Sequence, residues 1–262
     1  MGVRVSCAPL PFSRASPRPA GACSTSRLPA RPVRAFRSAR STKPPTERHP
    51  PANLRRQPEK ALVLDLDAVI VPQCPLIGDR ICKFVADHLK VSLAAGTNLN
   101  RIMYKTYGHS YIGLKKHCFI PQSFSEFNQL IYKDLDEFAG WLAKPDTIAK
   151  AEDAGRAISD LKLRGFVPVV FTNAPSLWCD FVLESTGLSA KLPIRLTCDD
   201  AALLKPLDAA YGRVERHLGS NVLYHFVDDS ITNLAPVYQR DRWSSYHFKD
   251  GDSLTDLLDI LY

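Results

Sequence analysis

Long apolar runs are missing from this chain of 262 residues. No run approaches the roughly 18 residues that a membrane-spanning helix needs, so we expect no membrane partner. Closely spaced cysteine pairs are missing too, because the seven cysteines include no Cys-x-x-Cys motif and five of them, an odd number, lie beyond residue 60. This pattern disfavours a disulfide framework and a structural zinc site, and it predicts reduced thiols in a non-secretory compartment.

Acidic residues are scarce at the N-terminus. Within residues 1–60, Glu47 and Glu59 are the only acids against 13 Lys and Arg, which gives this segment a net charge of +11. The rest of the chain has 21 basic and 25 acidic side chains, a net charge of −4. The basic excess therefore belongs to the N-terminal segment, and the mildly acidic body disfavours a nucleic-acid polymer as partner.

Residues 1–58 are predicted to be a leader that does not fold on its own. They contain 11 of the 20 prolines, many Arg and Ser residues and little apolar content. N-termini of this kind are typical of organelle transit peptides. The prolines favour a chloroplast or other plastid over a mitochondrion, whose presequences form amphipathic helices. A disordered tail without a targeting role is the alternative. Residues 59–262 are then the folded domain.

The most informative segment of the body is an apolar run that leads into two acids, 61–71 (ALVLDLDAVIV). Such a run predicts a strand buried on both faces. The period of two sends the side chains of Asp65 and Asp67 in the same direction. Two like charges at a buried strand end repel each other unless a cation neutralises them. The segment contains no Lys or Arg that could neutralise these two acids. Its sequence therefore predicts a bound cation.

Strands and helices alternate along the rest of the body, which predicts an α/β fold: a three-layer, Rossmann-like parallel sheet. Further strands are predicted at 166–171, 194–198, 221–227 and 244–248. Amphipathic helices are predicted at 81–89, 99–107, 124–132, 151–163, 176–185 and 207–218.

The connection after the first strand is unusually long. Thr172 lies 107 positions beyond Asp65, whereas a parallel crossover needs about a dozen residues. We therefore expect a helical cap, about 73–148, inserted after the first strand. Its aromatic cluster is either a set of substrate contacts or a packing stripe. The members of this cluster are Tyr104, Lys105, Tyr107 and Tyr111.

Polar side chains follow three of the predicted strands. Ligands of open parallel sheets bind at the carboxyl ends of the strands, so these side chains should converge. Carboxylates in this number suit Mg²⁺, and the hydroxyl, amide and ammonium groups suit an anion. The candidate metal ligands are Asp65, Asp67, Asp228 and Asp229, and the candidate phosphate-binding residues are Thr172, Asn173 and Lys205.

A metal and anion donors around a carboxylate predict phosphoryl transfer through an aspartyl-phosphate. Asp65, first at the strand end, is the predicted nucleophile. Asp67 is the predicted general acid and then general base, a task for which its pKa should be raised. Thr172 and Lys205 would neutralise the charge on the phosphoryl oxygens.

Four short segments resemble, in order, the four motifs of the haloacid dehalogenase (HAD) superfamily. They are Asp65-x-Asp67-x-Val69, Phe171-Thr172-Asn173, Lys205-Pro206 and Asp228-Asp229. More narrowly, the chain resembles the pyrimidine 5′-nucleotidase group of that superfamily. The segments that carry this likeness are Phe171–Ala174, Lys205-Pro206, Phe226–Ser230 with Asn233, and Tyr104-Lys105-x-Tyr107-Gly108 with Gly113-Leu114.

The resemblance covers about residues 60–250. It implies a HAD-like hydrolase domain with a helical cap that acts as a Mg²⁺-dependent phosphatase on small phosphate monoesters similar to UMP or CMP. FMN, a sugar phosphate and phosphoglycolate are alternative substrates. A catalytically silent binding module on the same fold is an alternative of another class. The sequence does not determine the oligomeric state.

Overall fold

The computed structural model describes residues 59–117, 119–219 and 221–260. The predicted leader, 1–58, lies outside these residues. Every helix within the described residues is too short or too polar to cross a membrane.

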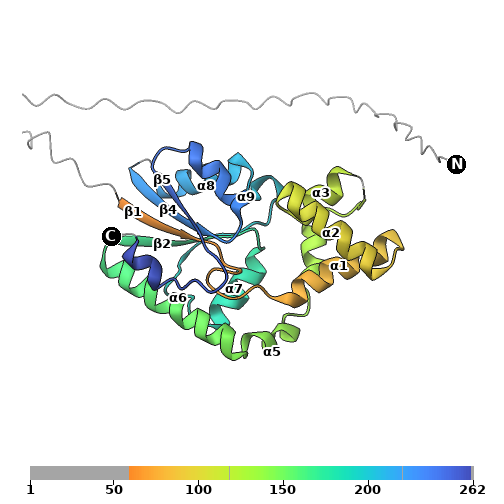
Figure 1. Ribbon diagram of the computed structural model, residues 1–262, viewed down its shortest axis with the longest axis horizontal. Coiled ribbons are helices and arrows are strands. Elements are labelled where there is room, and N and C mark those ends of the chain that lie inside the picture. The colour runs from red at the N-terminus through yellow and green to blue at the C-terminus, as the bar shows by residue number, and fades with distance from the viewer. Residues whose placement is uncertain (1–58, 118, 220, 261–262) are drawn as a thin grey trace, which may run out of the picture. The chain divides into compact units, whose positions relative to one another are not determined.

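Five parallel strands form a single sheet in the order β3-β2-β1-β4-β5 (Figure 1). They are β1 (Glu59–Leu64), β2 (Phe166–Phe171), β3 (Ile194–Leu196), β4 (Val222–Asp228) and β5 (Trp243–His247). The central strand β1 pairs on both sides, so that Leu64 lies beside Val170 of β2 and Val227 of β4. This register brings the carboxyl ends of β1, β2 and β4 to one edge of the sheet.

Helices cover both faces of the sheet. On one face, Leu62 and Leu64 of β1 belong to a buried cluster with α6 (Pro145–Leu163) and α7 (Ser176–Ser185). On the other face, Ala61 and Val63 belong to a buried cluster with α8 (Asp208–Leu218) and with the short helices α9 (Ile231–Leu234) and η3 (Ala235–Gln239). Alternate residues of one strand thus enter different cores, as its period of two requires. The predicted three-layer α/β fold is confirmed.

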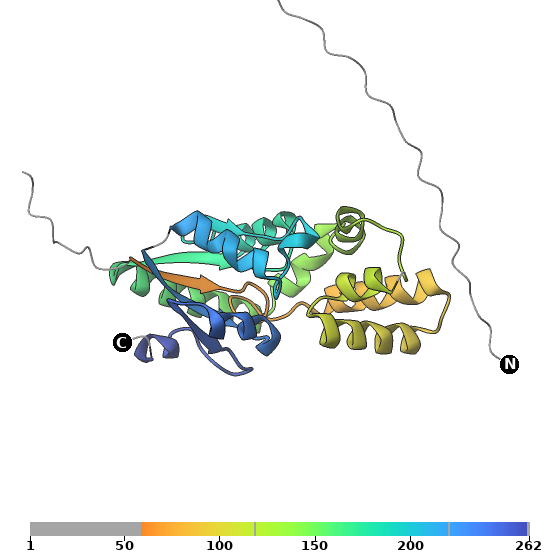
Figure 2. The same cartoon turned by 90° about the horizontal axis from the view of Figure 1, so that it is seen from above.

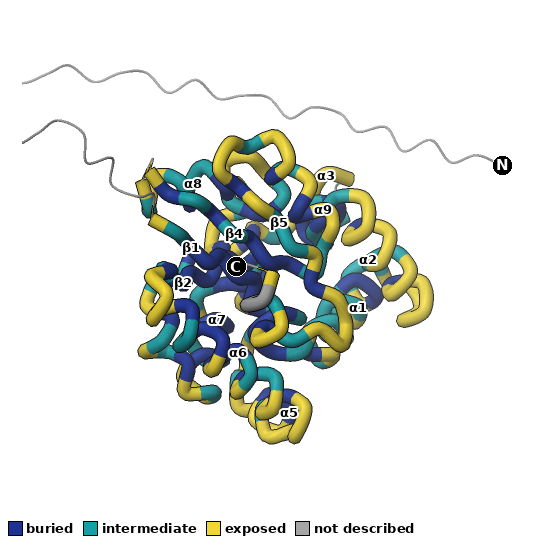
Figure 3. Tube along the Cα trace, turned by 60° about the vertical axis from the view of Figure 1, so that its left-hand side comes forward, coloured by how far each residue is buried: buried dark blue, intermediate teal, exposed yellow. Residues whose placement is uncertain are grey.

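A helical insertion separates β1 from α6 and lies beyond the carboxyl ends of the strands (Figure 2). Met103, Leu114 and Phe127 of the insertion belong to a third buried cluster, which also includes Cys198 and Leu204 of the α/β core. The prediction of a helical insertion after the first strand is confirmed. Its elements are α1 (Pro75–Leu89), α2 (Leu93–Tyr107), α3 (Ser110–Lys116), α4 (Phe124–Ile131), η1 (Leu135–Phe138) and α5 (Ala139–Leu142). Buried residues are concentrated in the sheet and in the inward helix faces (Figure 3).

Several helix boundaries differ from the predicted ones. Helix α6 begins at Pro145 rather than at residue 151, because a proline is favourable in the first turn of a helix. Helix α3, which the sequence pattern did not predict, packs closely against α2. A Cβ atom on Gly113 would lie 2.7 Å from the Met103 sulfur, so glycine is needed for this close approach. Beyond β5, a 3₁₀ helix (η4, Asp256–Asp259) follows near the C-terminus.

Candidate active site

The loop directly after β1 carries Asp65. Its backbone N–H donates to the carbonyl of Val227 on β4 at 3.0 Å, which extends the sheet register by one residue. The N–H of Leu66 donates to Asp65 Oδ1 at 2.7 Å. The residue as a whole is 7% exposed. The loop therefore holds this buried carboxylate in a defined orientation at the sheet edge.

Lys205 brings three strand ends together. Its fully buried ammonium lies 3.1 Å from Asp65 Oδ1 and 2.6 Å from Asp228 Oδ2, and it donates to the carbonyl of Phe171 at 2.8 Å. Three acceptors match the three donors of an ammonium group. The ends of β1, β2 and β4 thus share one buried cation, through the predicted acids Asp65 and Asp228 and through the backbone of Phe171.

Asn173 holds the backbone of Lys205. Its Oδ1 accepts from the Lys205 N–H at 2.7 Å, and its Nδ2 donates to the Lys205 carbonyl at 2.9 Å. The oxygen and the nitrogen of the Asn173 amide therefore both bind the main chain of Lys205. The peptide bond from Lys205 to Pro206 is cis. The sequence predicted that Asn173 binds phosphate, whereas these contacts favour a role in positioning Lys205.

Three carboxylates lie close enough to hold one metal ion. Each of Asp65, Asp228 and Asp229 offers an oxygen within 4.8 Å of the others. Asp228 is fully buried and accepts from the Ser230 N–H at 2.8 Å and from the Asn233 amide at 3.0 Å. The three acids with Lys205 leave a formal charge of −2, and all the donor atoms are hard oxygens. This set fits Mg²⁺.

The pKa shifts follow from crowding acids in a buried place. Burial raises the pKa of Asp65 well above its ordinary range, Lys205 lowers it, and Asp228 and Asp229 raise it further. Burial and then Asp228 raise the pKa of Asp229. Burial acts to lower the pKa of Lys205, but Asp228 and Asp65 outweigh it and hold that pKa above its ordinary value. The acids thus favour a neighbouring cation.

Asp67 lies apart from this trio, although it was predicted as a fourth carboxylate ligand. The indole N–H of Trp178 on α7 donates to its Oδ1 at 3.1 Å. Burial raises the pKa of Asp67 to about 6, against the lowering effect of the Trp178 hydrogen bond. A carboxyl group that titrates near neutrality suits proton transfer. Its orientation by an indole also explains why it does not join the carboxylates around Lys205.

A cavity of about 130 Å³ lies against these residues, and residues of the insertion form part of its lining. Thr172 lines it, and because its Oγ1 accepts from the Ala174 N–H at 3.1 Å, the hydroxyl proton is free to point elsewhere. The other polar core residues that line the cavity are Asp65, Asp67, Asn173, Asp229 and Asn233.

Of the four candidates in the insertion, Tyr104 lines the cavity and the other three do not. Tyr107 shares a hydrogen bond with His117 at 2.7 Å. Tyr111 donates to the carbonyl of Gln122 at 3.3 Å and packs against Phe124. The alternative of a packing role therefore fits Tyr107 and Tyr111, and Lys105 lies away from the cavity.

The insertion also supplies lining residues that the sequence analysis did not single out: Ile77, Ile81, His109, Ser110 and Tyr132. His109 lies at the N-terminus of α3, where its Nδ1 accepts from the Tyr111 N–H at 3.1 Å. Burial lowers the pKa of His109 to about 4, so the ring is neutral near pH 7. Because Nδ1 accepts, the proton resides on Nε2. The one signal in the sequence was the position of His109 directly after a helix-ending glycine.

The likeness of this chain to known proteins lies in its structure. No protein-family model matches it, and no curated protein matches it. Solved structures do resemble it. A HAD phosphatase from Thermococcus onnurineus is 17% identical, with a TM-score of 0.46, over 77% of this chain and 97% of the other.

Two other solved structures also resemble the chain. A predicted phosphoglycolate phosphatase from Haemophilus somnus is 15% identical, with a TM-score of 0.47, over 78% of this chain and 98% of the other. The HAD domain of an effector protein from Legionella pneumophila is 13% identical, with a TM-score of 0.43, over 78% and 93%. At such low identity the functional interpretation depends on the geometry of the site itself.

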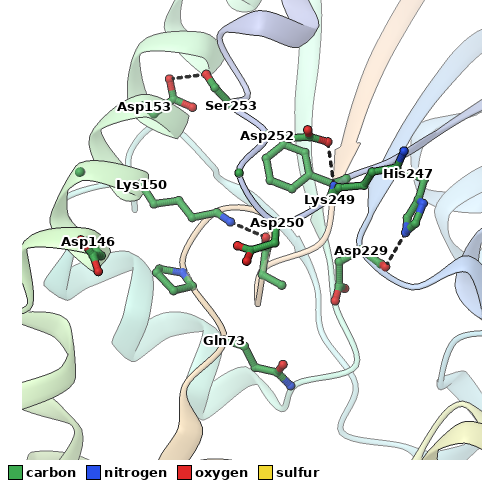
Figure 4. Close-up of a pocket in the computed structure, with 15 residues that line it drawn as sticks. Gln73, Asp146, Lys150, Asp153, Asp229, His247, Lys249, Asp250, Asp252 and Ser253 are labelled. Carbon is green, nitrogen blue, oxygen red and sulfur yellow. Dashed lines mark hydrogen bonds between the residues drawn. The ribbon is translucent and has the colours of Figure 1, made fainter.

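A second, larger cavity of about 870 Å³ adjoins the first and shares Ala68, Gln73 and Asp229 with it (Figure 4). It lies between α6 and the segment 247–253. Lys150 extends from α6 into this cavity, and its ammonium donates to the carbonyl of Ala68 at 2.6 Å. Ala68 is the residue directly after Asp67, so this cavity reaches the loop that carries Asp65 and Asp67.

The insertion touches the core directly beside Lys205. Gly108, between α2 and α3, has a φ of +73°, and a Cβ atom there would lie 2.8 Å from Cδ of Pro206. Glycine is required both for this backbone conformation and for the close contact. The insertion therefore meets the sheet edge at the residue that follows the buried ammonium.

Proposed function

We propose that this chain is a Mg²⁺-dependent phosphatase of the HAD type that hydrolyses small phosphate monoesters. The observation that carries the proposal is the buried ammonium of Lys205 between Asp65 and Asp228, with Asp229 beside them. One cation and three acids at the edge of a parallel sheet form a site for a divalent metal and a phosphate group. The cavity that opens onto them gives the substrate a place to bind.

The residues take the following roles in this proposal. An oxygen of Asp65 attacks phosphorus, the ester P–O bond breaks, and the leaving oxygen takes a proton from Asp67. Asp67 then removes a proton from water, the water oxygen bonds to phosphorus, and the bond between Asp65 and phosphorus breaks to release phosphate.

Three further parts of the site assist these steps. The hydroxyl of Thr172 donates to a phosphoryl oxygen, and Lys205 holds the Asp65 carboxylate in place and acts to lower its pKa against the effect of burial. Mg²⁺, held by the three acids, would neutralise charge on the phosphoryl group.

We further propose that the substrate is a nucleoside 5′-monophosphate similar to UMP or CMP. Tyr104, Tyr132 and Ile81 give the cavity a flat aromatic and apolar lining, against which a pyrimidine ring can pack. The neutral ring of His109 offers an N–H to a carbonyl oxygen, a group that the pyrimidine base has.

The leader is proposed to direct the protein to a plastid, with a mitochondrion as the alternative. This rests on the composition of residues 1–58 alone. A fluorescent fusion that carries residues 1–60 should accumulate in plastids. A fusion that stays in the cytosol would contradict this part of the proposal.

The test of the reaction is phosphate release from a panel of UMP, CMP, FMN, a sugar phosphate and phosphoglycolate, with and without a chelator. We expect release that requires Mg²⁺ and favours UMP or CMP. Asp65→Asn should lower turnover by at least about 10³-fold, because it removes the nucleophile. Asp136→Asn is the matched control, since Asp136 is an exposed acid in the insertion.

The outcomes separate the alternatives. Hydrolysis of phosphoglycolate or of a sugar phosphate in preference to UMP and CMP would refute the nucleotide assignment and leave the phosphatase. Binding of a nucleotide without any hydrolysis, unchanged in Asp65→Asn, would favour a silent binding module instead.

A further inference from the structure

The catalytic loop has a backbone conformation that needs support. Ala68, directly after Asp67, has a φ of +65°, in the left-handed region. A residue with a Cβ pays about 1–2 kcal/mol for this conformation relative to an ordinary one. Strained backbone of this kind persists where the surroundings hold it in place. Some contact must therefore stabilise Ala68 in its orientation.

Lys150 makes that contact. Its ammonium donates to the Ala68 carbonyl at 2.6 Å, across 82 positions of sequence. The donor is charged and half-buried, which strengthens the hydrogen bond. Figure 4 shows Lys150 crossing the larger cavity from α6 to reach this point.

The same side chain also touches the loop after β5. The Lys150 ammonium lies 4.9 Å from the centre of the ring of Phe248, in a cation–π arrangement. Phe248 is buried, and its backbone N–H donates to the carbonyl of Asp228 at 3.0 Å. Lys150 therefore connects α6 with the loop that carries Asp65 and Asp67 and with the backbone of Asp228.

Helix α6 is itself secured to the C-terminal segment one turn further on. The Asp153 carboxylate accepts from the Leu254 N–H at 2.8 Å and from the Ser253 hydroxyl at 3.0 Å. Lys150 and Asp153 are three residues apart and therefore lie on the same side of the helix. The base of the Lys150 side chain is thus anchored, as a positioning group requires.

We infer that Lys150 is a positioning residue that holds the Ala68 carbonyl and thereby sets the orientation of the Asp65–Ala68 loop for the chemistry. It acts through Ala68 and does not touch the substrate. This inference rests on the proposed function for its kinetic consequence and on the geometry alone for its effect on the loop.

The experiment compares the full chain with Lys150→Met, which keeps an unbranched apolar stem of the same length but removes the donor. The first readout is amide hydrogen exchange at Ile70 and Val71, whose N–H groups both donate to the Leu66 carbonyl within this loop. We expect exchange at least about tenfold faster in Lys150→Met, because the loop opens more often.

The second readout is steady-state hydrolysis of p-nitrophenyl phosphate with Mg²⁺. We expect kcat to fall by about 10- to 100-fold, with KM unchanged, as for a misplaced reacting group. Lys150→Arg, which keeps a charged donor, should restore both readouts to within about threefold. Lys162→Met removes an exposed lysine from the same helix and should match the wild type in both.

A glycine at position 68 provides a further check on the mechanism. Gly adopts positive φ without strain, so Lys150→Met should cost less in kcat in the Ala68→Gly background than in the wild type. If Lys150→Met does not fold, Lys150→Leu, which also has no donor, takes its place with the same expectations.

Unchanged exchange at Ile70 and Val71 in the donor-deleted variant would overturn the inference. So would a raised KM with an unchanged kcat, because that pattern belongs to a residue that binds substrate directly. If the wild type hydrolyses nothing, the proposed function fails, and hydrogen exchange alone still decides whether Lys150 positions the loop.

Discussion

Replacing Lys205 with Met tests the centre of the site most directly. The side chains of Lys205 and Asp228 are fully buried, and the side chain of Asp65 is 11% exposed. Methionine keeps the apolar stem and removes the ammonium, which leaves two buried carboxylates without their shared partner. Removing one member of a buried pair costs about 3–5 kcal/mol, because the remaining charge is uncompensated.

This loss of folding free energy should be measurable in the metal-free protein. For a folded domain of this size each kcal/mol shifts Tm by about 2–4 °C, so Lys205→Met should lower Tm by roughly 6–20 °C in a chelator at pH 7.5. The loss should be smaller at pH 5, because Asp65 has a raised pKa and can take up a proton there. Added Mg²⁺ should stabilise the variant more than the wild type, since the metal then supplies the missing positive charge.

The assay is thermal and urea-induced unfolding followed by circular dichroism, with Lys83→Met as the matched control. Lys83 also contacts a carboxylate, Asp87 at 2.7 Å, but both side chains are mostly exposed. An exposed pair of this kind contributes about 0.3–0.5 kcal/mol. A loss below about 1 kcal/mol in Lys205→Met, similar to the control, would refute the argument that burial makes this ion pair indispensable.

Two further predictions concern Asp67 and Asp153. The pKa of Asp67 is raised to about 6, so in the metal-free protein its contribution to stability is present below pH 4 and is lost as pH rises through 6. Asp67→Asn should therefore raise Tm in a chelator at pH 7.5 and not at pH 4. The same substitution should lower kcat by about 10²–10⁴-fold. An equal change in Tm at both pH values would contradict the stability prediction. Asp153→Ala removes the acceptor for the Leu254 N–H and the Ser253 hydroxyl and should cost about 1.5–3 kcal/mol, with faster tryptic cleavage of the C-terminal segment. Asp250→Asn, an exposed acid nearby, should change stability by less than about 0.5 kcal/mol, and an equal loss in both variants would rule out the anchoring role of Asp153.

The parts of the site that follow strand ends were predictable because strand geometry is local. The apolar run before Asp65 predicts a buried strand, and a parallel sheet brings the ends of its strands to one edge. Asp65, Asp228 and Lys205 do meet there. The same reasoning placed Asp67 with the metal ligands, but it could not foresee that the indole of Trp178 donates to the Asp67 carboxylate.

Residues of the insertion were harder to assign. The sequence grouped Tyr104, Tyr107 and Tyr111 as one aromatic cluster, but helix packing separates them: Tyr104 lines the cavity, while the other two bond within the insertion. His109 lines the cavity because of the turn at Gly108. Spacing in the sequence does not determine which face of a short helix meets a neighbouring element.

By itself, the sequence determined the α/β class, the long insertion after the first strand and the acids at the strand ends, because these depend on apolar periodicity and chain length. Tertiary structure alone decided which acids share the ammonium of Lys205, that Asn173 holds the lysine backbone, and that Lys150 supports Ala68 from 82 positions away. The physical reason is the distance along the chain over which each kind of interaction acts. Periodicity acts over a few residues, whereas a hydrogen bond between distant segments depends on how whole helices pack against the sheet.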